Sequence, residues 1–187
     1  ITKLKAAIAS GRQAYWVCPL VEESEFMDLT AAEERFKVLC AALGDAHVGL
    51  VHGQLPPMEK DAAMAAFVAG KTQVLVATTV IEVGVDVPNA TIMVIERAEN
   101  FGLAQLHHRR GRVGRGLQAS NCVLLYQTPL SANGKQRLSV MRESSDGFYI
   151  AEKDLELRGP GEVLGTRQTG LMEFRIASLP AHSHLLD

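Results

Sequence analysis

The chain has 187 residues and a formal net charge of −2, and 47% of its residues are hydrophobic. This length suits one domain with a small appendage, and the apolar content is ample for a buried core. The charge balance excludes a protein that is basic overall, so any contact with nucleic acid must come from local clusters. No stretch of the sequence reaches the roughly 18 apolar residues of a membrane span.

The three cysteines, Cys18, Cys40 and Cys122, lie far apart, and two of them fall in apolar runs. This spacing fits neither a disulfide framework nor a metal site, so we expect buried thiols in a reducing, cytoplasmic compartment. The sequence begins with Ile1 and shows no signal peptide. We therefore expect it to be a piece of a longer protein.

Continuous apolar runs predict five buried strands. They lie at residues 14–18, 47–51, 73–77, 91–95 and 121–126. Helical patterns at residues 1–10, 30–43 and 56–70 and around residue 105 alternate with these runs. Thr30 and Glu33 have the spacing of a capping box, which predicts that the second helix begins there after an acidic connection. Buried strands that alternate with helices indicate an α/β fold, a mostly parallel sheet with helices on both faces.

The pattern changes after Pro129. Residues 133–141 and 148–157 look helical, and no strand pattern recurs beyond them. Arg158 then opens a loop rich in glycine and proline. We place a boundary near residue 130, between an α/β domain at 1–130 and a helical extension at 131–187.

Residues 105–116 form the stretch around which the chain is organised. They hold four arginines among three glycines, namely Arg109, Arg110, Arg112 and Arg115. Arginine presents a rigid fork of donors to phosphate oxygens, and glycine lets the backbone approach a ligand closely. The alternative is a solvated basic loop. Apolar residues at helix-like spacing just before the run favour a helix that delivers the arginines to one place, so we expect a phosphate-directed role.

The stretch His108-Arg-Arg-Gly-Arg-Val-Gly-Arg115 resembles the pattern HRxGRxGR, the sixth motif of superfamily 2 helicases. This resemblance implies that Arg112 and Arg115 stabilise charge on the phosphoryl group that ATP transfers. It also implies that His108 and Gly111 contact the nucleotide.

A second motif follows the third strand, where Thr79 precedes Gly84 by five positions and Asp86 by seven. Ordinary turn chemistry explains these residues equally well, but ligands in open α/β sheets bind at such strand ends. Beside the arginine run, the stretch resembles the fifth helicase motif. The resemblance implies that Thr79 contacts the DNA backbone and that Gly84 and Asp86 lie at the nucleotide. His52 and Gly53 similarly resemble a loop that meets the DNA.

Residues 146–170 closely resemble the translocation motif of the RecG family of branch-migrating helicases, and the wider resemblance runs from about residue 15 to 171. It implies a helical hairpin with a loop in which Arg158, Arg167 and Gln168 couple the ATP state to DNA movement. A passive helical cap is the alternative. RecG proteins usually carry Gln and Leu at the positions of His108 and Arg109, and the sequence assigns no role to Arg109.

The sequence contains no GxxxxGK[ST] phosphate loop and no Asp-Glu-x-His motif, which ATP chemistry in this superfamily requires. The resemblance therefore implies a second RecA-like domain, of P-loop NTPase type, that is inactive alone. ATP with Mg²⁺ would be shared with a preceding RecA-like domain of the same polypeptide. The expected protein is a helicase that acts on branched double-stranded DNA in recombination and repair. We expect a monomer in the bacterial cytoplasm, associated with the nucleoid. We expect no membrane partner and no metal site in this chain. The alternatives are a transcription-repair coupling translocase and a non-catalytic phosphate-binding α/β module.

Overall fold

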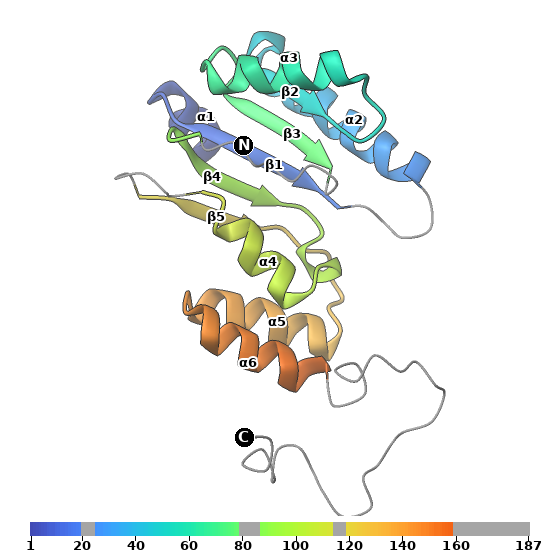
Figure 1. The fold of residues 1–187 in the computed structure, drawn as a ribbon, viewed down its shortest axis with the longest axis vertical. Coiled ribbons are helices and arrows are strands. Elements are labelled where there is room, and N and C mark those ends of the chain that lie inside the picture. The colour runs from blue at the N-terminus through green and yellow to red at the C-terminus, as the bar shows by residue number, and fades with distance from the viewer. Residues whose placement is uncertain (20–24, 79–86, 114–118, 159–187) are drawn as a thin grey trace, which may run out of the picture.

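The computed structural model describes residues 1–19, 25–78, 87–113 and 119–158. Its strands form one sheet in the order β2-β3-β1-β4-β5, and each pairing is parallel. The strands are β1 (Gln13–Cys18), β2 (Val48–Val51), β3 (Val74–Thr78), β4 (Ala90–Ile95) and β5 (Asn121–Leu124). The expected parallel sheet is confirmed (Figure 1).

The described part of the chain contains six helices. They are α1 (Thr2–Ala9), α2 (Glu25–Leu43), α3 (Pro57–Val68), α4 (Leu103–Arg110), α5 (Ala132–Glu143) and α6 (Gly147–Arg158). Two short 3₁₀ turns, η1 (Asp45–His47) and η2 (Ala98–Asn100), complete the set. Figure 1 shows α4 between the β4–β5 edge of the sheet and the pair formed by α5 and α6.

The strands are apolar on both faces because each face is covered by helices. In β1, Tyr15 and Val17 join a core with α3, α4, α5 and α6. Ala14, Trp16 and Cys18 point the other way and join a second core with α1 and α2. The continuous apolar pattern therefore reports burial on both sides in β1, β3 and β4, whose residues are all buried. The predicted burial of the fifth strand is wrong, because β5 lies at the edge of the sheet and its residues are exposed or only partly buried.

The second helix departs from the sequence prediction. It begins at Glu25, so Thr30 lies inside α2 and the predicted capping box is wrong. No glycine or proline lies between Glu25 and Thr30, and the helical hydrogen bonding therefore continues toward the N-terminus without interruption. A Thr-x-x-Glu spacing occurs inside helices as well as at their starts.

The cysteines are free thiols, with Cys18 and Cys40 buried and Cys122 partly buried. Burial raises the pKa of Cys18 to about 12 and the pKa of Cys122 to about 11. These values leave both thiols protonated and unreactive near neutral pH, because the thiolate is the nucleophile. The expectation that the cysteines belong to the core agrees with this burial.

The packing of α3 on the sheet yields a stability prediction. Phe67 is fully buried, and its ring centroid lies 4.9 Å from that of Tyr15. We expect Phe67→Ala to lower the free energy of unfolding by about 3–5 kcal/mol, because it leaves a cavity against the sheet. The neighbouring Val68 is 48% exposed, so Val68→Ala should change that free energy by no more than about 0.5 kcal/mol. Urea titration of the chain measures both, and equal losses for the two variants would contradict the packing described.

Candidate functional site

The expected site residues fall into two groups. Those outside the described residues are Thr79, Gly84, Asp86, Arg115, Arg167 and Gln168. Those that the structure places are His52, Gly53, His108, Gly111, Arg112 and Arg158. The placed residues lie around two features, the carboxyl edge of the sheet and the helix α4.

Helix α4 is held by its apolar face, as the sequence indicated. Leu103 and Leu106 are fully buried, and the side-chain Oε1 of Gln105 accepts a hydrogen bond of 3.0 Å from the Gly102 backbone N–H at the start of the helix. The helix ends at Arg110. Arg112 therefore lies just past the helical turn, in the stretch of residues 107–113 that we call the arginine segment.

The arginine segment brings two predicted nucleotide contacts together. The Nη2 atom of Arg112 lies 2.7 Å from Nε2 of His108. A guanidinium only donates, so His108 accepts through Nε2. His108 is exposed and Arg112 is partly exposed, and exposed Gly111 joins them. This arrangement holds a permanent positive charge at the surface, which suits an anionic ligand.

Arg109 has a role that sequence reasoning missed. Its guanidinium carbon lies 4.7 Å from the centroid of the Phe101 ring, a cation–π arrangement. Burial lowers the pKa of Arg109 from its ordinary value. The aromatic residue just before α4 was the available signal, since an arginine at the end of a short helix can fold back over it.

Arg110 also contacts the protein itself. Its Nη1 atom donates to the backbone oxygens of Met141 at 3.1 Å and Ser144 at 2.7 Å. Its Nη2 atom lies 3.1 Å from Nδ1 of His107. The four arginines that the sequence presents as one cluster therefore have different surroundings where the structure describes them.

The carboxyl edge of the sheet positions the predicted DNA loop. His52 directly follows β2, and β2 pairs with β3 with Val51 opposite Ala77. Thr78, the residue before Thr79, therefore lies at the same edge as His52. The His52 side chain is only 7% exposed, and its Nδ1 atom has no hydrogen-bond partner among the described residues.

Two further features mark this loop. Burial lowers the pKa of His52 from its ordinary value, against an opposing effect of the Glu33 carboxylate. The Nζ atom of Lys60, on α3, donates a hydrogen bond of 2.6 Å to the backbone oxygen of Gly53. A buried imidazole and a hydrogen bond from Lys60 therefore lie at the turn that follows β2.

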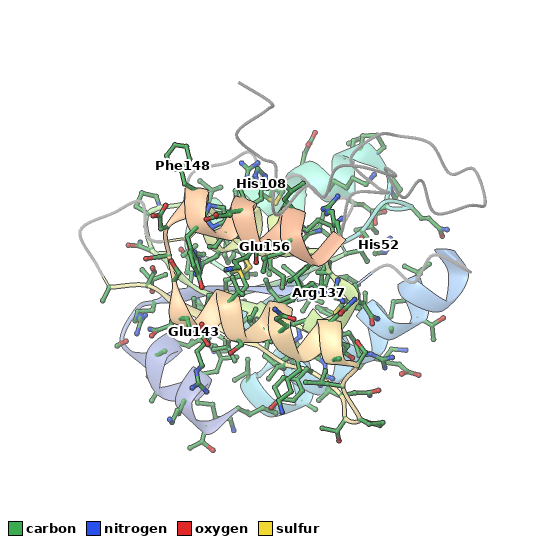
Figure 2. The ribbon with its side chains drawn as sticks, turned by 90° about the horizontal axis from the view of Figure 1, so that it is seen from below. His52, His108, Arg137, Glu143, Phe148 and Glu156 are labelled. Atoms are coloured by element: carbon green, nitrogen blue, oxygen red, sulfur yellow. The ribbon has the colours of Figure 1, made fainter. Side chains whose placement is uncertain are left out.

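The helical extension meets α4 along its length. Figure 2 looks onto α5 and α6, which lie side by side. Nη2 of Arg158, at the end of α6, lies 2.9 Å from Oδ2 of Asp154 and 3.6 Å from where a Cβ on Gly102 would stand. The predicted coupling residue thus lies at the start of α4, whereas the pair of His108 and Arg112 lies at the other end.

A polar cluster that the sequence did not reveal fixes the end of β4. The Nε1 atom of Trp16 donates to Oε1 of Glu96 at 2.6 Å, and Arg35 pairs with the same carboxylate. The guanidinium carbon of Arg35 lies 5.5 Å from the Trp16 ring centroid. Trp16 is a core residue, as predicted, and this cluster ties α2 to two strands.

Within residues 1–19, 25–78, 87–113 and 119–158, no three side chains of metal-ligating type gather closely enough to hold an ion. The helices described in this chain are too short or too polar to cross a bilayer.

Family models match both parts of the chain. The model described as the helicase conserved C-terminal domain matches residues 1–116. The model described as ATP-dependent DNA helicase RecG, domain 3, C-terminal, matches residues 144–187.

Individual relatives agree with these models. The ATP-dependent DNA helicase RecG of Escherichia coli K12 is 63% identical over 174 residues, which cover 93% of this chain and 25% of the relative. That of Acidithiobacillus ferridurans is 58% identical over 186 residues, which cover 100% of this chain and 27% of the relative. The chain thus spans about a quarter of the length of these relatives.

Solved structures give the same result. A structure of RecG bound to a three-way DNA junction is 42% identical with a TM-score of 0.72, over 99% of this chain and 23% of that one. The C-terminal domain of S. cerevisiae Dbp5 is 18% identical with a TM-score of 0.52, over 88% of this chain and 93% of that one, and supports the fold alone. The chain therefore belongs to the family of helicase conserved C-terminal domains, and the resemblance to the C-terminal region of RecG helicases is confirmed.

Proposed function

We propose that this chain is the second motor domain, with its translocation hairpin, of an ATP-dependent DNA helicase that remodels branched DNA. The observation that carries the proposal is the position of α4. One end of this helix leads to the pair of exposed His108 and partly exposed Arg112, and the other end meets Arg158 of α6. A single rigid element thus joins a surface suited to phosphate to the hairpin that would act on DNA.

The nucleotide in this proposal is ATP with Mg²⁺, held mainly by a preceding RecA-like domain that supplies the phosphate loop. Arg112 and Arg115 stabilise the charge that develops on the transferring phosphoryl group. His108 and Gly111 line the nucleotide from the arginine segment, and the exposure of both residues supports this role. Gly84 and Asp86 complete the lining from the segment after β3.

The DNA contacts in this proposal lie at the carboxyl edge of the sheet. Thr79, His52 and Gly53 contact the DNA backbone, and the register of β2 against β3 supports their proximity. Arg158, Arg167 and Gln168 couple the ATP state to movement of the duplex. The likeness to a RecG structure bound to a three-way junction supports branched double-stranded DNA as the ligand.

The remaining proposals concern the whole protein, and the bacterial origin of the relatives supports a bacterial source. The whole protein acts as a monomer in the bacterial cytoplasm, associated with the nucleoid. It carries out fork regression and migration of Holliday junctions during recombination and repair. The boundary near residue 130 separates the motor domain from the helical extension. A transcription-repair coupling translocase is disfavoured by the 63% identity to RecG, and a non-catalytic phosphate-binding module by the match of residues 144–187 to the RecG model.

A chimera tests the proposal directly. The matching 174 residues of E. coli RecG are replaced by those of this chain, and DNA-stimulated ATP hydrolysis and fork unwinding are measured. We expect both activities, whereas the isolated chain should show no micromolar affinity for ATP with Mg²⁺ in calorimetry, because it lacks the phosphate loop. A folded chimera without DNA-stimulated hydrolysis would contradict the proposal, and tight ATP binding by the isolated chain would contradict the shared site.

The arginine segment gives a second prediction. In the chimera, Arg112→Ala and Arg115→Ala should each reduce ATP hydrolysis strongly, toward the factor of roughly 10³–10⁵ known for arginine fingers. DNA binding should persist, because neither residue is assigned to the DNA. Arg142→Ala, at an exposed position on α5, is the matched control. Near-normal turnover by the Arg115 variant would remove it from the catalytic role.

The loop after α6 gives a third prediction. The double variant Arg167→Ala plus Gln168→Ala should lose fork unwinding while DNA-stimulated ATP hydrolysis survives, because Arg112 and Arg115 are untouched. A passive cap would instead lose both activities together with the melting temperature. Steady-state hydrolysis, gel-based fork unwinding and thermal melting of the same preparation separate these cases. A stable variant that unwinds forks normally would show that neither residue couples ATP to DNA.

A further inference from the structure

Arg110 contacts other partners than the pair of His108 and Arg112. Its guanidinium donates to the backbone oxygens of Met141 at 3.1 Å and of Ser144 at 2.7 Å. Met141 belongs to the last turn of α5, where backbone oxygens have no partner within the helix. A cation at this end also interacts favourably with the helix dipole. Arg110 therefore caps the C-terminus of α5.

His107 extends this contact to α6. Its Nδ1 atom lies 3.1 Å from Nη2 of Arg110, and because a guanidinium only donates, Nδ1 accepts. Its Nε2 atom lies 3.2 Å from where a Cβ on Gly147 would stand, at the first residue of α6. We call the contact of Arg110 and His107 with Met141, Ser144 and Gly147 the hairpin joint.

We propose that Arg110 and His107 are positioning residues. They attach the pair of helices α5 and α6 to the C-terminal end of α4, where the arginine segment lies. The inference rests on the proposed function. Arg112 lies two residues beyond Arg110. A shift of Arg112 when the phosphate binds or leaves would therefore also displace Arg110 and the hairpin joint. Arg110 is then a link between nucleotide and hairpin, and not a phosphate ligand.

The chemistry of the joint requires arginine. One planar guanidinium reaches two backbone oxygens and an imidazole at once, each through a different N–H of a rigid fork. The ammonium of lysine is a single compact group and cannot span the same three acceptors. Arg110→Lys should therefore restore only part of what Arg110→Gln removes, although it keeps the charge.

The joint is first tested without reference to ATP or DNA, by hydrogen exchange in the chain itself. Arg110→Gln should speed exchange of the Ser144 and Ile150 amides, which bond to Val140 and Asp146, by roughly tenfold or more, as expected for the loss of charge-assisted hydrogen bonds. Arg142 is exposed on α5, and Arg142→Gln should leave both exchange rates unchanged. Unchanged exchange in the Arg110 variant would overturn the joint.

A double-mutant cycle tests the contact with α6 independently. Gly147→Ala places a methyl group against the His107 ring, so it should speed exchange of the Ile150 amide. In a His107→Ala background the same substitution has room, and its effect should shrink. Equal effects of Gly147→Ala in both backgrounds would show that α6 does not bear on His107.

The chimera then decides whether the joint transmits movement. Arg110→Gln should reduce the number of forks unwound per ATP hydrolysed, by roughly tenfold if most of the joint's contacts are lost. DNA-stimulated hydrolysis should remain close to that of the unmodified chimera. Hydrolysis that falls as in Arg115→Ala would make Arg110 a phosphate ligand, and unimpaired unwinding would make the joint purely structural; either result overturns the inference. An inactive unmodified chimera would instead count against the proposed function, while the exchange results would still stand.

Discussion

The burial of α4 is the constraint on which the rest of the site depends. Leu103 and Leu106 are fully buried in a core shared by the sheet, α5 and α6, so the helix cannot shift without opening that core. Both ends of α4 are fixed as a result. The pair of His108 and Arg112 is held at one end, and Gly102 meets Arg158 at the other.

The three described arginines at the C-terminal end of α4 each contact a different partner. Arg109 lies over the Phe101 ring, Arg110 bonds to backbone oxygens at the end of α5, and Arg112 bonds to His108. Like charges this close in sequence would otherwise repel one another. The arrangement leaves the His108–Arg112 end open to solvent while two other guanidiniums strengthen the fold.

The topology of the sheet forms the second feature of the site, the carboxyl edge with His52 and Gly53. All strands of the described sheet are parallel, so β2 and β3 end at one edge although more than twenty residues separate their ends in sequence. His52 and Thr78 meet there, and Lys60 fastens the turn at Gly53. Such carboxyl edges are where open α/β sheets bind ligands, because loops and not side-chain layers cover them.

Much of this protein was determined by the sequence alone. The five apolar runs are the five strands of the described sheet, although the edge strand β5 is not buried, and the apolar spacing before Arg109 is the buried face of α4. The sequence prediction missed the start of α2 at Glu25, because the Thr-x-x-Glu spacing does not show whether the preceding residues are already helical. Only the tertiary structure decided what Arg110 contacts. Arg110 bonds to residues 31 and 34 positions away, and no local pattern encodes which of several distant helix ends will come within reach of a guanidinium.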